Sequence, residues 1–122
     1  VVMRLDDVQS GANLEALRAG RAAIVTQAAR LEAELAGRPA ITFPPELLDT
    51  RDPRAAEAVA GQRQLFAART ESLRSQLSVL ETRRDQARAT IRSAEGQLAA
   101  SREQLALIRQ EEVMRRNLVN QG

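Results

Sequence analysis

The 122-residue chain is 43% hydrophobic, but it contains no Trp, no Tyr and only two Phe. It therefore lacks the bulky side chains that usually fill a compact core. All 18 basic residues are Arg, and the net charge of +2 is too small to indicate nucleic-acid binding. Without Cys or His, the chain has no disulfide, no thiolate or imidazole catalysis and no zinc-thiolate site. Its richness in Ala, Leu, Arg, Gln and Glu favours an elongated all-α coiled coil.

The chain opens with a short β-prone run over residues 1–5, which stops at Asp6 and Asp7, and residues 1–6 are the predicted strand remnant. Five residues make no sheet, so a strand here would belong to a domain outside this chain, and a frayed tail is the alternative. Because the first residue is not Met, we expect a fragment whose membrane anchor, if it has one, lies elsewhere. The apolar runs are far shorter than the roughly 20 residues that span a bilayer.

A first coiled-coil helix is predicted over residues 7–36. Asp6 or Asp7 can cap it, because a short carboxylate accepts hydrogen bonds from the free N–H groups of the first turn. Gly37 is its expected end. The apolar side chains follow a heptad pattern, with Arg21 as the charged exception. These apolar positions are Leu14, Leu17, Ile24, Ala28, Leu31 and Leu35.

Residues 37–52 contain three prolines, which do not fit a helix interior. Four apolar side chains in this stretch predict an ordered, non-helical loop that packs against the helices. They are Ile41, Phe43, Leu47 and Leu48. The run Phe43-Pro44-Pro45 could instead be a ligand for a proline-recognising domain, but a single Pro-Pro pair is weak evidence and packing is the preferred interpretation.

A second, very long helix is predicted over residues 53–119, with Asp52 as its cap and Pro53 at its first position. One heptad register holds throughout, and its helix-packing seam contains large apolar residues. These are Phe66, Leu73, Leu77, Leu80, Ile91, Leu98, Leu105 and Ile108. The helix would be about 100 Å long and the first helix about 45 Å. More than half of the seam therefore needs a partner, either a further helix or another copy, and we expect the fragment to self-associate.

The sequence gives no support for a catalytic, cofactor-binding or metal site, so we expect no enzyme. Glu111 and Glu112 stand four residues before Arg115 and Arg116, a spacing typical of solvated ion pairs on a helix. An arginine cluster near residue 84 is interleaved with acids and has no aromatic neighbour, which argues against nucleic-acid binding. Arg84 itself falls on the seam, where a buried guanidinium needs an acidic partner from a neighbouring helix.

Four stretches of the chain are similar to motifs of one known family. They are residues 2–7, Val-Met-Arg-Leu-Asp-Asp, residues 29–34, Ala-Arg-Leu-Glu-Ala-Glu, residues 41–47, Ile-Thr-Phe-Pro-Pro-Glu-Leu, and residues 62–69, Gln-Arg-Gln-Leu-Phe-Ala-Ala-Arg. In order and spacing they resemble the HlyD family of membrane fusion proteins, the periplasmic adaptors of bacterial type I secretion. The first stretch looks like the last strand of the first lipoyl-like half-motif as it enters the helix, and the other three resemble segments of the protease- and lipase-exporting branch.

The resemblance implies a helical hairpin in a tube, usually hexameric, between an inner-membrane ABC transporter and a TolC-like outer-membrane channel. The protein would lie in the periplasm, anchored to the inner membrane by segments outside this chain. The returning helix would also lie outside it. Residues 120–122 would begin the hairpin tip. The residues that bind the channel would lie close to this end of the chain: Arg115, Arg116, Leu118 and Val119. A generic dimeric coiled-coil scaffold is the alternative, since it explains the heptads equally well.

Overall fold

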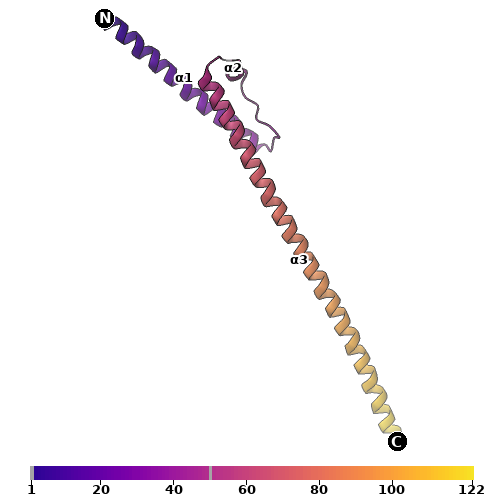
Figure 1. The fold of residues 1–122 in the computed structure, drawn as a ribbon. Helices are drawn as coiled ribbons and strands as arrows, with labels where there is room; N and C mark the ends of the chain where they lie inside the picture. The colour runs from indigo at the N-terminus through magenta and orange to yellow at the C-terminus, as the bar shows by residue number, and fades with distance from the viewer. Residues whose placement is uncertain (1, 50) are drawn as a thin grey trace. The chain divides into compact units, whose positions relative to one another are not determined.

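The computed structural model describes residues 2–49 and 51–122, and three helices account for most of them. Figure 1 shows α1 (Val2–Leu35), the single turn α2 (Pro45–Leu48) and the long α3 (Pro53–Gln121). The described residues contain no strand, which confirms the predicted all-α class. The chain divides into two units, Val1–Arg74 and Ser75–Gly122, and α3 passes from the first into the second. Unit 1 holds the helix–helix packing, and unit 2 is a single helix.

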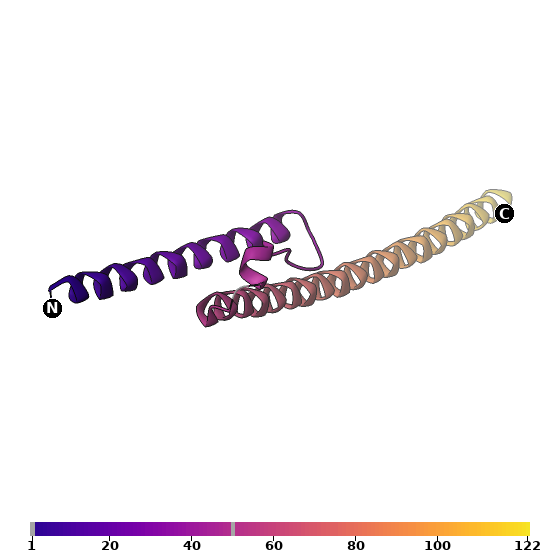
Figure 2. The same cartoon turned by 90° about the horizontal axis from the view of Figure 1, so that it is seen from above.

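Within unit 1, α1 and the beginning of α3 lie side by side and run in the same direction (Figures 1 and 2). Contacts between their side chains fix this parallel alignment. Arg30 bonds to Gln62, 32 positions further along the chain, and Glu34 bonds to Arg69, 35 positions further along. The loop between the helices therefore returns along the pair before α3 starts. It is a crossover and not the turn of a hairpin, because hairpin limbs are antiparallel.

The first helix begins earlier than predicted. Helix α1 starts at Val2, so the strand expected over residues 1–6 is absent from residues 2–6, and Val1 lies outside the described residues. Asp6 and Asp7 lie inside the helix and are not its cap, so that prediction was wrong. The physical reason is that a strand needs a neighbour to satisfy its backbone N–H and C=O groups, whereas a helix satisfies most of them internally.

Gly37 ends α1 as predicted. Its φ of 61° lies in the left-handed region, which glycine adopts without steric cost. The Gly37 N–H donates to the Glu34 carbonyl at 3.2 Å, and the Arg38 N–H donates to the Ala33 carbonyl at 2.9 Å. These two bonds form a Schellman motif, which satisfies carbonyls that the helix end would otherwise leave without a partner.

The connection between α1 and α3 is anchored by one aromatic side chain. Phe43 is buried, and the Arg63 guanidinium of α3 lies 5.5 Å from the centre of its ring, a cation–π distance. Leu47 is half-buried, but Leu48 is 51% exposed, so its predicted role as an anchor was wrong. The loop also contains the helical turn α2, so the prediction of a non-helical loop was wrong over Pro45–Leu48. The physical reason is that Pro45 can occupy the first position of a helix without losing a hydrogen bond.

The start of α3 follows the sequence prediction. The Asp52 carboxylate accepts a 3.0 Å hydrogen bond from the Arg54 N–H, and Pro53 is the first helical residue. An acceptor at this position satisfies a backbone donor in the first turn. At its other end α3 continues to Gln121, two residues past the predicted boundary at residue 119. Two of the three residues expected to begin a tip, Asn120 and Gln121, are therefore helical.

Candidate helix-docking surfaces

The face of α1 that packs on α3 combines small side chains with the buried Arg30. Ala22, Thr26 and Ala33 are buried, and they lie on one side of the helix. On α3, Val59 and Phe66 are buried opposite them. Small residues at a helix contact allow the two axes to approach closely. The Thr26 hydroxyl donates to the Ala22 carbonyl at 2.8 Å, so its burial leaves no polar group without a partner.

A polar cluster fixes the register between the two helices. Arg30 is only 4% exposed; its Nε donates to Gln62 Oε1 at 2.6 Å, and one of its terminal nitrogens forms an ion pair with Glu34. Arg69 of α3 reaches the other oxygen of Glu34 at 3.2 Å. The hydrogen bond from Arg30 is the main reason why the pKa of the Glu34 carboxyl lies below its ordinary value, and Arg69 adds to the effect against the opposing influence of burial.

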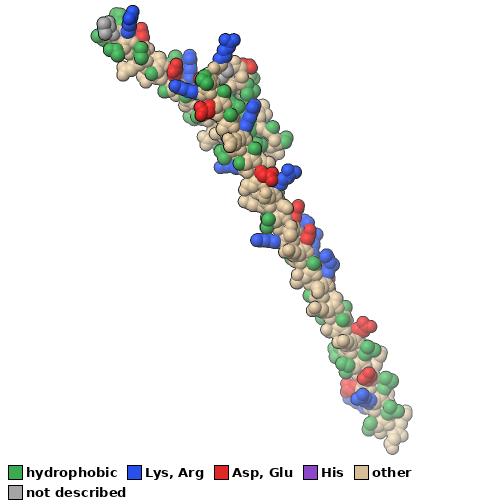
Figure 3. Space-filling model, in the orientation of Figure 1, with side chains coloured by type: hydrophobic (Ala, Val, Ile, Leu, Met, Phe, Trp, Pro, Cys, Tyr) green, Lys and Arg blue, Asp and Glu red, His purple; other side chains and the backbone are tan. Residues whose placement is uncertain are grey.

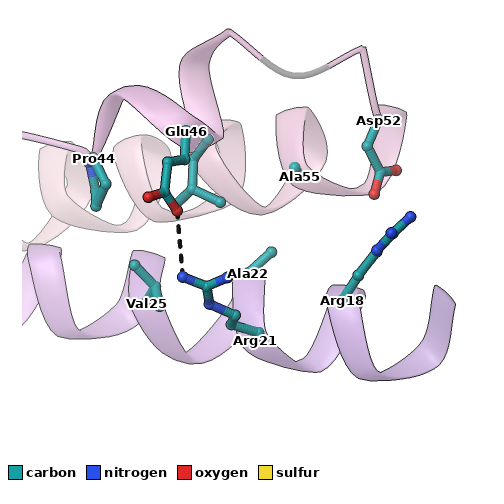
Figure 4. Close-up of a pocket in the computed structure, with 9 residues that line it drawn as sticks. Arg18, Arg21, Ala22, Val25, Pro44, Glu46, Asp52 and Ala55 are labelled. Atoms are coloured by element: carbon teal, nitrogen blue, oxygen red, sulfur yellow. Dashed lines mark hydrogen bonds and ion pairs between the residues drawn. The ribbon is translucent and has the colours of Figure 1, made fainter. Parts of the chain in front are cut away.

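A groove of about 450 Å³ lies where α1, α2 and the start of α3 meet (Figure 4). Arg21 and Glu46 form an exposed 3.3 Å ion pair across it. Ala22, Val25 and Ala55 contribute apolar side chains to its wall. The groove contains two cations and two carboxylates, so its charges balance and it has no clear preference for a charged ligand.

The predicted heptad of α1 lies on the side of the helix that faces away from α3. At about 100° per residue, Ile24 is about 200° around the helix from Ala22. Leu17, Ile24 and Leu31 recur at seven-residue intervals and are 72%, 70% and 45% exposed. We call these three residues the outer Leu/Ile stripe of α1. Sequence reasoning expected this heptad to be a packing seam, and it missed the Ala/Thr face that contacts α3, because small residues carry little hydrophobic signal.

Of the predicted α3 seam residues, Phe66 is buried against α1 and the other seven are exposed. The exposed ones are Leu73, Leu77, Leu80, Ile91, Leu98, Leu105 and Ile108. Figure 3 shows hydrophobic side chains reaching the visible surface of unit 2. Arg84 contacts the adjacent Asp85 at 3.1 Å, so within this chain its carboxylate partner comes from its own helix. The predicted use of this seam by a partner helix stays a prediction.

The residues predicted at the hairpin tip are all exposed: Arg115, Arg116, Leu118 and Val119. Arg116 forms the expected ion pair with Glu112, at 2.8 Å and one helical turn away. Both partners are largely in solvent, so the pair contributes little to stability. A guanidinium has five donors, and Arg116 therefore retains hydrogen-bonding capacity while it is paired.

Two further properties of the described residues concern metal ions and membranes. No group of His, Cys, Asp or Glu among them could hold a metal ion. None of the described helices has a stretch that is both apolar and long enough to cross a membrane.

Comparison with known proteins matches residues 10–122 to a family model described as "AprE, long alpha-helical hairpin". Among solved structures, the chain is similar to the soluble domain of LipC, a membrane fusion protein of a type I secretion system. The two share 29% sequence identity with a TM-score of 0.88. The match covers 94% of this chain and 44% of the LipC chain. No curated protein matches the sequence.

Proposed function

Because this chain belongs to the AprE long α-helical hairpin family, we propose that it is the helical part of a type I secretion membrane fusion protein. In this proposal the protein lies in the periplasm and joins an inner-membrane ABC transporter to an outer-membrane channel. Copies stand side by side and form part of a tube for protein export. The observation that carries the proposal is the similarity to LipC over nearly the whole of this chain.

The packing supports a role in assembly. Unit 2 is one helix with an exposed heptad seam, and an amphipathic helix obtains most of its stability from packing of its apolar face. This chain spans less than half the length of the LipC soluble domain. We propose that the antiparallel limb of the hairpin lies in the full-length protein outside these residues and covers the seam of unit 2.

Secretion in cells that carry the full-length protein tests this function. We propose that Arg115, Arg116, Leu118 and Val119 meet the channel, where guanidinium groups would bind carbonyls or carboxylates. The combined variant Arg115→Glu, Arg116→Glu and Leu118→Asp should abolish secretion while membrane insertion, assembly with the transporter and helicity stay intact. The matched control is Arg102→Glu, another exposed cation on the same helix.

Cross-linking from position 118 identifies the partner directly. A photoreactive side chain at Leu118 should yield adducts with the outer-membrane channel. Adducts with the transporter alone would reverse the proposed orientation. Normal secretion by the combined variant would contradict the role of these residues, and normal secretion without the protein would contradict the function itself.

A further inference from the structure

We propose that α1 and α3 can pack in two registers, one heptad apart, and that the side-chain amide of Gln62 beside Arg30 selects the register in the structure. This conformational device lies within unit 1 and goes beyond the proposed function, because it depends on no partner of the chain. It consists of a heptad-spaced core that permits a shift of α3 along α1 and a buried polar contact that opposes the shift.

The packed faces of α1 and α3 have the same spacing. Between positions 51 and 66, the residues that are not exposed are Asp52, Ala55, Ala58, Val59, Gln62 and Phe66. Each stands 33 positions after a residue of α1 that is also not exposed. These α1 residues are Ala19, Ala22, Val25, Thr26, Ala29 and Ala33. Steps of four, three and four residues, as from Ala22 to Ala33, are those of a heptad core. The two helices therefore pack in parallel, with level residues 33 positions apart.

A shift of α3 by one heptad would keep such a core. Level residues would then be 40 positions apart, and apolar side chains would still meet. The level pairs would include Ala19 with Val59, Thr26 with Phe66 and Ala33 with Leu73. Four of the six α1 core residues are Ala, so the shape of this face differs little from one heptad to the next. The shift would also lengthen the overlap, because α3 would begin beside residue 13 of α1 and not beside residue 20.

The loop between the helices is long enough for both registers. It connects the end of α1 at Leu35 to a start of α3 that lies beside residue 20, about 22 Å back along the pair. In the shifted register this distance would be about 33 Å. Of the 17 loop residues 36–52, four form α2, and the other 13 reach about 43 Å when extended. The length of the loop therefore does not decide the register.

The buried polar contact separates the two registers. Arg30 is 4% exposed, and its Nε donates to Gln62 Oε1 at 2.6 Å. After the shift, Arg69 would take the place of Gln62 beside Arg30, since the two α3 residues are seven positions apart. A buried guanidinium would lose an acceptor and face a second cation, which is costly where water is excluded. Arg69 would also move away from Glu34, which it contacts at 3.2 Å.

Moving the amide should therefore move the register. Gln62→Leu with Arg69→Gln removes the acceptor from its present level and places one a heptad further along. Arg30 keeps its ion pair with Glu34 in this variant. A core polar residue that finds its partner in only one alignment is an established means of fixing the register of a coiled coil.

Disulfides within one chain report the register, because residues 1–122 contain no Cys. Thr26→Cys with Val59→Cys reports the register in the structure, and Ala19→Cys with Val59→Cys reports the shifted one. In either register the other pair is about 10 Å out of level, which is beyond the reach of a disulfide. The full-length protein is oxidised mildly, and disulfides in the monomer are quantified by non-reducing peptide mapping.

The ratio of the two disulfides is the readout. With the natural Gln62 and Arg69, the pair at positions 26 and 59 should form roughly tenfold more disulfide than the pair at 19 and 59. Gln62→Leu with Arg69→Gln should invert this ratio. Arg30→Leu with Gln62→Leu removes both partners of the contact, so the two disulfides should form to within about threefold of each other. Arg21→Gln with Glu46→Gln is the matched control: it removes an exposed contact between α1 and α2 and should leave the natural ratio unchanged.

Three outcomes would overturn the proposal. An unchanged ratio in Gln62→Leu with Arg69→Gln would mean that another contact, such as the buried Phe43 of the loop, sets the register. Loss of both disulfides in that variant would mean that the polar contact holds the helices together and does not choose between alignments. Equal amounts of both disulfides with the natural Gln62 and Arg69 would show that no single register is selected.

Discussion

At the scale of single residues, the Arg30 cluster has the clearest consequence for stability. Arg30 is buried and Glu34 is the carboxylate that balances its charge. Glu34→Gln keeps an acceptor but removes this charge, which leaves a buried cation unbalanced. We expect a lower Tm by circular dichroism at pH 7. The control Glu46→Gln breaks the exposed Arg21 pair and should change the Tm little. Equal shifts in the two variants would contradict this account.

The same carboxyl group gives unit 1 an acid sensitivity. The pKa of Glu34 is lower in the folded state than its ordinary value of 4.5, because Arg30 donates a hydrogen bond to the ionised form. Its contribution to stability is therefore complete above about pH 4.5 and is lost as the pH falls through the folded-state pKa. Urea unfolding at a series of pH values should show a weaker acid-induced loss for Glu34→Gln than for the natural chain. Parallel curves would contradict the prediction.

At the scale of the helices, the cap of α1 gives opposite expectations for two glycines. Gly37 has a φ of 61°, so Gly37→Ala should lower the free energy of unfolding by about 1 kcal/mol. Gly20 lies inside α1, and a side chain added there meets nothing within 4 Å. Gly20→Ala should therefore raise the free energy of unfolding by about 0.5–1 kcal/mol. Urea denaturation of both variants measures the two effects. A change of the same sign in both free energies of unfolding would contradict the opposite roles expected for the two glycines.

The helices also show what sequence can predict. Gly37 and the Asp52-Pro53 pair carry local chemistry that ends or starts a helix in any context, so these boundaries were predicted closely. The start of α1 was missed because residues 2–6 are β-prone and a strand depends on neighbours that periodicity cannot supply. The parallel crossover was also beyond sequence reasoning, since a loop of this length permits either direction. Its direction is set by long-range contacts such as Arg30 with Gln62.

At the scale of the whole molecule, the heptad pattern predicted which residues of α3 are apolar and periodic but not which partner covers them. Phe66 is buried because α1 ends close to it, and the same stripe continues through unit 2 on a single helix. In α1 the pattern pointed to the outer Leu/Ile stripe, whereas the contact with α3 uses Ala and Thr side chains together with Arg30. Periodicity identifies a surface that favours a helix, and only the structure shows whether that surface is already in use.

The seam of unit 2 gives the last prediction, which concerns residues 1–122 as an isolated chain. Leu98 is a seam residue, 51% exposed in one copy, so two chains can bury it against each other in place of the missing limb. Sedimentation velocity should show association that grows with protein concentration. Leu98→Asp should weaken this association at least tenfold, because a carboxylate in an apolar seam loses its hydration. Ala100→Asp adds the same charge about 200° away around the helix and should leave it nearly unchanged. If the natural chain stays monomeric at the highest concentrations, this seam does not pair with itself, and covering it would require the second limb of the hairpin.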